Sequence, residues 1–204
     1  MVTPLRFVVG VSGASGAVLA RHAVDTLLAR GCEVIITASH TAQDIWQQEL
    51  GLKLEASLAD WSQRGVVRYY RPGDFNAPIA SGSYPIAGMI VIPCSISTIG
   101  SLASGFSTNL IQRAADCCIK EGRRLVVVPR ETPLSAIHLE NLLKLARSGV
   151  FVVPPVPAFY THPRDVDDIV HQIVGRALSV LGVPDALDPQ HVWTGRTPPR
   201  EGAG

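Results

Sequence analysis

Short runs of hydrophobic residues alternate along the chain with longer segments whose hydrophobic positions recur at helical spacing. The short runs are rich in β-branched residues and have no regularly polar side, which is typical of strands buried on both faces of a parallel sheet. They lie at residues 5–11, 33–38, 89–93, 124–129 and 150–153. The helical segments lie at residues 18–28, from 39–41 to 50, and at 108–121, 137–146 and 166–181. This alternation predicts an α/β fold: a doubly wound, mostly parallel sheet in a flavodoxin-like or Rossmann-like three-layer sandwich.

The length of 204 residues suits one well-buried domain and is slightly short for two. We find no internal repeat and no interdomain linker, so we expect a single α/β domain over residues 1–183. The prolines at 184, 189, 198 and 199 predict an extended C-terminal tail over residues 184–204 that can reach a neighbouring subunit. Residues 71–88 hold too many turn formers for a helix and too many prolines for a central strand, which indicates a long functional loop or lid.

The charge balance is nearly neutral, with 18 basic and 17 acidic residues and a formal net charge of +1. This gives no electrostatic reason to expect nucleic acid or an anionic membrane surface, so we expect a small-molecule partner. The cysteines at 32, 94, 117 and 118 lack the paired spacing of a zinc site and the density of a disulfide-rich secreted protein. No signal peptide and no membrane-spanning hydrophobic run is recognisable, so the sequence predicts a cytoplasmic protein with reduced thiols.

Residues 10–17, with the sequence GVSGASGA, separate the first predicted strand from the first predicted helix. Small residues there let a ligand approach the backbone, the helix N-terminus favours an anion, and the hydroxyls of Ser12 and Ser15 add donors. A tight packing turn explains the same sequence about equally well. The glycines at 10, 13 and 16 resemble a dinucleotide motif, but residues 33–38 end without the acidic residue that usually binds the ribose. This favours a mononucleotide.

Two more predicted strands end in hydroxyl groups. Ser39 follows one of them, as either a ligand contact or an ordinary helix cap. Residues 94–98 (CSIST) form a hydroxyl-rich turn after another. Because parallel strands end at the same edge of a sheet, these turns predict a ligand crevice there. The sequence nominates no base for Cys94, so we favour a packing role over a nucleophilic one.

Three charged side chains share one face of the helix predicted at 108–121, because they are spaced three and four residues apart: Arg113, Asp116 and Lys120. An exposed stripe of ion pairs is the slightly favoured interpretation. The alternative is that the two cations converge on a phosphate, whose charge offsets their repulsion.

Two carboxylates are further candidates. Thr132 and Pro133 have the pattern of a helix cap and first helical residue, which places Arg130 and Glu131 at the carboxyl end of the strand 124–129. Glu49 lies in a polar helix, where most glutamates are merely solvated. The residues alone therefore favour a site role for Glu131 over one for Glu49.

Four segments together resemble the UbiX family of flavin prenyltransferases. They are residues 12–17 (SGASGA), 80–83 (ASGS), 109–116 (NLIQRAAD) and 129–141 (PRETPLSAIHLEN), in the family's order. The resemblance extends over the chain from about residue 5 to 181. The glycine loop by itself is less specific, since other small flavoproteins share it.

The resemblance implies a flavodoxin-like enzyme that joins a dimethylallyl group from dimethylallyl phosphate to reduced FMN. A fourth ring forms between N5 and C6 of the flavin, no metal takes part, and the product serves a UbiD-type decarboxylase. Family members are usually dodecamers with sites at subunit interfaces, so a homo-oligomer is expected.

The resemblance also implies the roles of individual residues. The expected FMN contacts are Gly13, Ala14, Ser15, Ser39, Ser95, Ile96, Ser97, Thr98 and Arg130. The expected prenyl phosphate contacts, some of them from a neighbouring subunit, are Arg113, Lys120, Tyr160 and Arg176. Catalytic proton transfer falls to Ser15, Glu49 and Glu131, and the group that accepts the C6 proton stays open. Phe75 stands where we expect Trp, which keeps an aromatic ring but loses the indole N–H.

Two other functions are weighed against this one. An FMN-dependent cysteine decarboxylase is similar in the flavin loop but uses a catalytic histidine and a different asparagine motif, whereas His138 here lies in the segment 129–141. A non-catalytic flavin carrier has no need of a second phosphate site, so the basic residues disfavour it.

Overall fold

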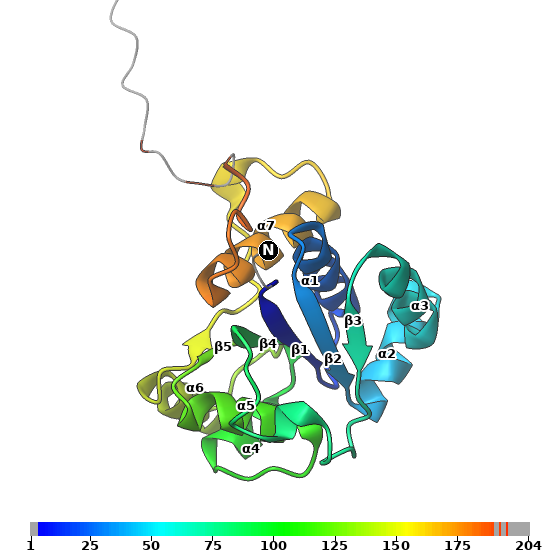
Figure 1. Cartoon of the computed structure of the whole chain (residues 1–204). Helices are drawn as coiled ribbons and strands as arrows, with labels where there is room; N and C mark the ends of the chain where they lie inside the picture. Colours follow the sequence, from blue (N-terminus) through cyan, green and yellow to red (C-terminus); the bar gives the residue numbers. More distant parts are fainter. Residues whose placement is uncertain (1–3, 190–191, 193–194, 196–204) are drawn as a thin grey trace, which may run out of the picture.

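The computed structural model describes residues 4–189, 192 and 195. A six-stranded sheet forms its centre, with every neighbouring pair of strands parallel and the order β3-β2-β1-β4-β5-β6 (Figure 1). The strands are β1 (Arg6–Val11), β2 (Glu33–Ala38), β3 (Val67–Tyr69), β4 (Gly88–Cys94), β5 (Arg124–Pro129) and β6 (Phe151–Val152). The α-helices are α1 (Ala17–Ala29), α2 (His40–Leu50), α3 (Leu54–Arg64), α4 (Ile96–Ala103), α5 (Leu110–Lys120), α6 (Ala136–Arg147) and α7 (Val166–Leu181). Two short 3₁₀ helices are η1 (Pro78–Ala80) and η2 (Phe159–Thr161).

The hydrophobic strands supply side chains to two separate cores, one on each face of the sheet. In β1, Phe7 and Val9 pack with α1, α2, α3 and α7, whereas Val8 between them packs with α4 and α5. Successive side chains of a strand point to opposite faces, so a strand between two helical layers must be hydrophobic at every position. The predicted three-layer α/β fold is confirmed, with a sheet that is parallel throughout.

Several predicted elements have the observed bounds, namely β2, β5 and α7. The sequence pattern did not predict α3, β3 or α4. It was also wrong about the start of α6, because the cap is Ser135 and not Thr132. The Ser135 hydroxyl accepts a hydrogen bond from the backbone N–H of His138, and the His138 ring accepts one from the N–H of Ser135. This reciprocal capping satisfies two backbone donors at once, which Thr132 does not do.

The chain reverses its direction across the sheet between β1 and β4. From β1 it runs outward to β2 and β3, and after β3 it crosses to β4 on the other side of β1 and continues to β5 and β6. The loops that follow β1 and β4 therefore leave toward opposite faces, and a crevice opens between them at the carboxyl edge. The register places Val11 opposite Ala38, so the residues after β1 and β2 also meet at this edge.

The segment after α7 folds back on the domain. Val183 and Ala186 are buried, and the Arg30 guanidinium donates a hydrogen bond to the carbonyl of Asp185. Residues 184–189 thus pack against the domain and do not continue as the extended tail predicted from residue 184. Positions 190, 191, 193, 194 and 196–204 of that tail lie outside the described residues.

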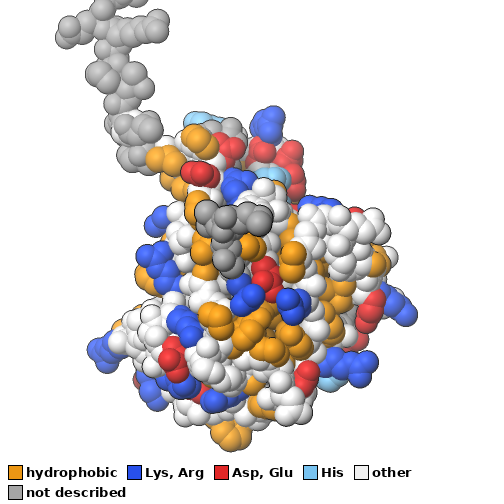
Figure 2. Space-filling model, in the orientation of Figure 1, with side chains coloured by type: hydrophobic (Ala, Val, Ile, Leu, Met, Phe, Trp, Pro, Cys, Tyr) orange, Lys and Arg blue, Asp and Glu red, His pale blue; other side chains and the backbone are white. Residues whose placement is uncertain are grey.

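The loop between β3 and β4 crosses the surface and contains only the short helix η1, in agreement with the long loop expected over 71–88. In the view of Figure 2, hydrophobic side chains gather near the centre and charged groups of both signs are spread around them. Neither sign forms a continuous surface on this face. Among the described helices, none has both the length and the hydrophobicity needed to cross a membrane.

Glu33, the first residue of β2, connects β2 to both of its neighbours, β1 and β3, near the amino edge of the sheet. Its side chain is only 7% exposed and accepts hydrogen bonds from Arg6, at 2.8 Å, and from Arg68, at 2.9 Å. The hydrogen bond from Arg6 lowers the pKa of Glu33, and this effect exceeds that of burial, which raises it. The carboxylate therefore stabilises the fold while it is ionised.

We expect Glu33→Gln to lower the free energy of unfolding by about 2 kcal/mol at pH 7, because charged hydrogen bonds to a buried carboxylate are lost. Since the folded-state pKa is lowered, the contribution is present above about pH 4.3 and is lost as the pH falls through the folded-state value. Urea unfolding should show that the difference in free energy of unfolding between the two proteins becomes smaller as the pH is lowered. Equal stability of the two proteins at pH 7 would contradict the stabilising role of the Glu33 carboxylate.

Candidate functional site

A cavity of about 170 Å³ lies at the carboxyl edge of the sheet, where the loops after β1, β2 and β4 meet. Its lining is polar except for one side chain and consists of Ser12, Gly13, Ser39, Thr41, Ser95, Ser97, Thr98, Asn109, Ile111 and Gln112. Five of the residues expected to bind the flavin are among them, namely Gly13, Ser39, Ser95, Ser97 and Thr98. The crevice predicted from the strand ends is therefore present.

Two helices begin at this cavity. Ser39 caps α2 by accepting a hydrogen bond from the N–H of Ala42, and Ser95 caps α4 by accepting one from the N–H of Thr98. The expected turn at 94–98 is shorter than predicted, since Ile96 already begins α4. Backbone N–H groups and the positive ends of two helices thus border the cavity, an arrangement that favours an anionic group.

The glycine loop fits tightly between α1 and α2. A Cβ atom at Gly13 would lie 2.9 Å from the Cβ of Thr41 in the first turn of α2. Gly16 has a φ of 116°, a conformation that side-chain-bearing residues rarely adopt. The small residues at these two positions are therefore required by packing and backbone conformation, as well as by any ligand.

The N-terminus of α1 already holds an anion, the side chain of Glu49 from the end of α2. Its carboxylate accepts hydrogen bonds from the backbone N–H of Gly16, at 3.0 Å, and of Ala17, at 2.8 Å. This corrects the expectation that the same helix end binds a ligand anion. The glycine loop offers its Ser12–Gly13 side to the cavity, and α1 binds Glu49.

Glu49 is ionised at neutral pH. Partial burial raises the pKa of its carboxyl, but the other effects together outweigh burial and lower the pKa below its ordinary value. These are the hydrogen bond from the Ser15 hydroxyl, those from the N–H groups of Ala17 and Gly16, and the charge of Arg130. The contact between Ser15 and Glu49 joins two of the three residues predicted to be catalytic. A carboxylate in this state can accept a proton and cannot act as a general acid.

The third predicted catalytic residue, Glu131, lies just beyond β5. The backbone N–H of Arg130 binds the carbonyl of Cys94 at the end of β4, and the Glu131 carboxylate accepts a hydrogen bond from the N–H of Thr132. Both side chains are exposed at the carboxyl edge. Cys94 is fully buried, and burial raises the pKa of its thiol far above the ordinary value, so the packing role is confirmed.

Arg113 and Lys120 lie on α5 beside residues 80–83. The Arg113 guanidinium donates a hydrogen bond to the carbonyl of Ala80 and forms an ion pair with Asp116 at 2.9 Å, while Lys120 pairs with Glu121. Both side chains are thus partnered in the single chain, as an ion-pair stripe would be. They also lie next to the ASGS segment that the sequence analysis singled out.

Tyr160 and Arg176 line a different cavity, of about 240 Å³, next to α7. Because α5 and α7 pack on opposite faces of the sheet, the four residues predicted to bind the prenyl phosphate form two separate pairs within one chain. Phe75 lies exposed in the loop between β3 and β4.

Three polar residues of the crevice were not among the predicted site residues: Thr41, Asn109 and Gln112. Asn109 caps α5 by accepting a hydrogen bond from Gln112, whose side chain in turn binds Thr108. A signal was available for Asn109, because Asn before a hydrophobic helix is a typical cap. Thr41 and Gln112 are placed by tertiary packing alone.

Comparison with known proteins agrees with this geometry. A family model described as Flavoprotein matches residues 1–178. Flavin prenyltransferase UbiX of Synechocystis sp. is 47% identical over 96% of this chain and 98% of its own length. The chain belongs to the UbiX flavin prenyltransferase family. The resemblance inferred from the four sequence segments is therefore confirmed.

Two solved structures extend the comparison. A dodecameric FMN-dependent UbiX-like decarboxylase from Escherichia coli O157:H7 is 43% identical, with a TM-score of 0.81 over 87% of this chain and 95% of that one. AnUbiX (PadA1) in complex with FMN and dimethylallyl pyrophosphate is 36% identical, with a TM-score of 0.87 over 96% of this chain and 100% of that one. These UbiX relatives share both sequence and fold with the chain.

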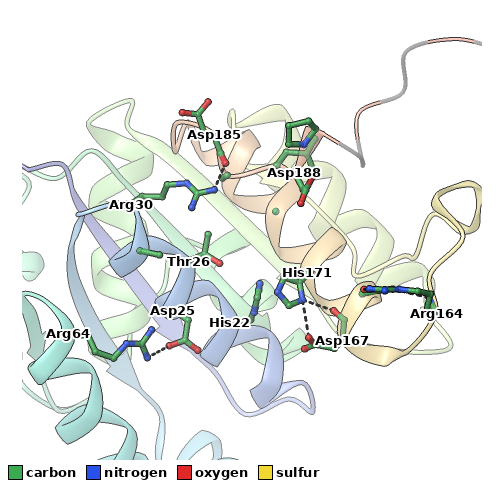
Figure 3. A pocket seen from close by; sticks show the side chains of 16 residues that line it. His22, Asp25, Thr26, Arg30, Arg64, Arg164, Asp167, His171, Asp185 and Asp188 are labelled. Carbon is green, nitrogen blue, oxygen red and sulfur yellow. Dashed lines mark hydrogen bonds and ion pairs between the residues drawn. The ribbon is translucent and has the colours of Figure 1, made fainter.

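A larger cavity, of about 860 Å³, lies between α1, α7 and residues 185–189 (Figure 3). It is lined by the last turns of α1, which runs back toward the amino edge of the sheet, and none of the predicted site residues borders it. His22 and His171 face each other there, with ring centroids 3.9 Å apart, and Asp167 lies beside His171 (Figure 3). This cavity is separate from the crevice at the strand ends.

We expect the histidine pair to make the packing of α7 on α1 sensitive to pH. Burial and the nearby His171 lower the pKa of His22, and the weaker effects of Asp167 and Asp25 only partly oppose them. In the unfolded chain His22 binds a proton below about pH 6.5, whereas in the folded chain it does so only at lower pH. We expect stability to fall as the pH drops below 6.5, and expect His22→Gln to lose less stability than the wild type between pH 7 and pH 5. The measurement is urea unfolding of both proteins at pH 7 and at pH 5. An equal loss of stability in the two proteins would contradict this prediction.

Proposed function

We propose that this protein is a flavin prenyltransferase that joins the dimethylallyl group of dimethylallyl phosphate to N5 and C6 of reduced FMN. The observation that carries the proposal is the polar crevice at the strand ends, whose lining includes five of the nine residues that the family resemblance assigns to the flavin. A mononucleotide such as FMN also fits the end of β2. That strand ends in Ala38 and is followed by Ser39, so it has no acidic residue to bind the ribose of a dinucleotide. The 47% sequence identity to the flavin prenyltransferase of Synechocystis sp. supports the reaction type.

In this proposal the hydroxyls of the crevice and the first turn of α4 hold the phosphate and polar groups of FMN. The proposed contacts are Gly13, Ala14, Ser15, Ser39, Ser95, Ile96, Ser97, Thr98 and Arg130. The crevice residues Thr41, Asn109 and Gln112 join them. The reduced flavin supplies the nucleophilic N5 and C6 positions, and the protein supplies binding, orientation and charge.

Arginine and lysine side chains drive departure of the phosphate. Breaking the bond between the allylic carbon and the phosphate oxygen leaves negative charge on the phosphate, which fixed cations stabilise without a metal. The groups we assign to this task are Arg113, Lys120, Arg130 and Arg176, with Tyr160 as a hydrogen-bond donor. Activity in the absence of added metal is part of the proposal.

Proton transfer is assigned to Ser15, Glu49 and Glu131. Attachment at N5 and at C6 removes one proton from each position; the departing phosphate takes up one, and an alkene carbon of the dimethylallyl group takes up the other as the bond to C6 forms. A group that accepts a proton and returns it must therefore lie near the flavin. Glu49 is held as a carboxylate by the N-terminus of α1 and is bonded to Ser15, which suits that task. Glu131 lies exposed next to Arg130 at the same edge of the sheet.

We further propose that the working enzyme is a homo-oligomer, a dodecamer as in the Escherichia coli relative. One chain keeps Arg113 and Lys120 on the opposite face of the sheet from Tyr160 and Arg176, so a second copy is needed to bring the two pairs to one phosphate. One face of α6 exposes hydrophobic side chains, with Leu139 53% and Leu143 50% exposed, and offers an apolar surface for such contacts.

The proposal includes a cytoplasmic location and delivery of the product to a UbiD-type decarboxylase. All four cysteines are buried free thiols, which agrees with a reducing compartment. On the face shown in Figure 2, charged side chains of both signs are mixed, so this face has no continuous basic surface for a nucleic acid.

Purified protein incubated anaerobically with reduced FMN and dimethylallyl phosphate should yield a flavin that is heavier by one dimethylallyl unit, with an altered absorbance spectrum, in a chelator-containing buffer. The reason is that cationic side chains take the place of a metal. Mass spectrometry of the released flavin checks this. Recovery of unmodified FMN would overturn the transferase, and flavin reduction by a peptidyl cysteine would favour a cysteine decarboxylase.

We expect Glu49→Gln and Glu131→Gln each to slow formation of the modified flavin by roughly 10²-fold or more, while FMN binding is retained, because only the proton acceptor is lost. Delivery of active cofactor to a decarboxylase reports the rate, and flavin fluorescence reports binding. Glu33→Gln, at the opposite edge of the sheet, serves as the control. Unchanged delivery by both variants would exclude these carboxylates from catalysis and favour a carrier.

A further inference from the structure

The cavity beside α7 contains a polar contact between the Gln172 side chain and the backbone of Ala158, and none of the predicted site roles explains it. Its lining includes Tyr160 from η2 and Arg176 from α7, together with Gln172, which lies one helical turn before Arg176. Gln172 is 8% exposed, although it is uncharged and polar and most of its neighbours on this face of α7 are hydrophobic. A buried amide must find hydrogen-bond partners, since its desolvation is otherwise uncompensated.

Both ends of the Gln172 amide bind the same residue, Ala158. The side-chain oxygen accepts a hydrogen bond from the N–H of Ala158 at 3.0 Å, and the side-chain nitrogen donates one to its carbonyl at 3.4 Å. This pairing fixes the orientation as well as the position of the backbone at Ala158. A hydrophobic side chain of the same size could fill the space but could not hold the backbone in this way.

Ala158 is the residue from which η2 starts, two positions before Tyr160. Its carbonyl also accepts a hydrogen bond from the Thr161 hydroxyl at 2.8 Å, so the whole turn is built on it. The segment before it is extended and proline-rich, with Pro154, Pro155 and Pro157, and has little regular structure of its own to hold it against α7. Gln172 is therefore a defined link between the Tyr160 turn and the helix that carries Arg176.

Arg176 is exposed, and in the described part of the chain no carboxylate forms an ion pair with it. Residues four positions apart in a helix lie on the same face, so Gln172 and Arg176 both point toward the cavity. An anion held jointly by Tyr160 and Arg176 requires a fixed separation between η2 and α7. The two hydrogen bonds of Gln172 to Ala158 connect η2 to α7 between these two residues.

We infer that Gln172 is a positioning residue that fixes Tyr160 relative to Arg176 and thereby sets the affinity for the phosphate group of the prenyl substrate. The inference rests on the proposed function. It concerns only the cavity beside α7, so binding of FMN at the strand ends should not depend on Gln172. Positional errors of about 1 Å are costly in such sites, on the order of 10²-fold.

The test compares Gln172→Leu and Gln172→Glu with the wild-type chain. We expect both variants at neutral pH to raise the KM for dimethylallyl phosphate roughly tenfold or more, with a smaller effect on kcat and no effect on FMN affinity. Calorimetric titration of dimethylallyl phosphate into the complex with oxidised FMN, which does not turn over, measures the same loss without catalysis. Glu33→Gln is the matched control for lowered stability, because it removes a buried polar contact far from this cavity.

Gln172→Glu adds a signature that a packing role does not have. Its carboxylate can accept from the N–H of Ala158 but repels the carbonyl, whereas the protonated form donates to that carbonyl as the amide does. The ratio of its KM to the wild-type KM should therefore fall as the pH is lowered from about 8 to about 5, while the ratio for Gln172→Leu should stay constant.

The outcomes separate the two proposals. Inactive wild-type protein would overturn the proposed function. An active wild type with Gln172 variants that bind dimethylallyl phosphate as tightly as the Glu33→Gln control would overturn the positioning role. A pH-independent defect in Gln172→Glu, equal to that of Gln172→Leu, would also overturn it, because the hydrogen bond to the carbonyl would then be irrelevant.

Discussion

The hydroxyl of Ser12 joins the ends of β1 and β4, and the rest of the site is arranged around this contact. It donates a hydrogen bond to the carbonyl of Pro93 and accepts one from the N–H of Ser95 at 2.7 Å. The two strands are neighbours in the sheet but are 77 residues apart between Val11 and Gly88. Because the side chain is buried and both partners are backbone groups, the loops after these strands diverge from one fixed point. The polar crevice is the space between them.

Glu49 changes what the glycine loop does. A strand, a small-residue turn and a helix usually present the helix N-terminus to a ligand phosphate. Here the end of α2 supplies a carboxylate to that position, and the two backbone donors at the start of α1 bind it. In the proposed function, this helix end holds the base Glu49 in its ionised state beside Ser15, and the ligand anion binds at the hydroxyl-rich start of α4. Under that proposal, one loop serves both binding and proton transfer.

Within a single chain, the four residues proposed to bind the substrate phosphate do not lie together. The α5 cations are paired with Asp116 and Glu121 and lie beside the ASGS segment, while Tyr160 and Arg176 lie on the opposite face of the sheet. In the proposed assembly, neighbouring chains bring the two pairs together, and the substrate phosphate offsets the charge of the gathered cations. The hydrogen bonds from Gln172 to Ala158 connect the Tyr160 turn to α7 within one such half.

The sequence by itself determined the layers, the order of most elements and the strand ends where the crevice lies. These features follow from local patterns, because a hydrophobic run must be buried and parallel strands end at one edge. It did not determine that α6 is capped by Ser135, that Glu49 binds Gly16 from 33 positions away, or that Gln112 faces the crevice. Those contacts depend on distances between helices, which side-chain packing across the whole domain sets and which no local pattern encodes.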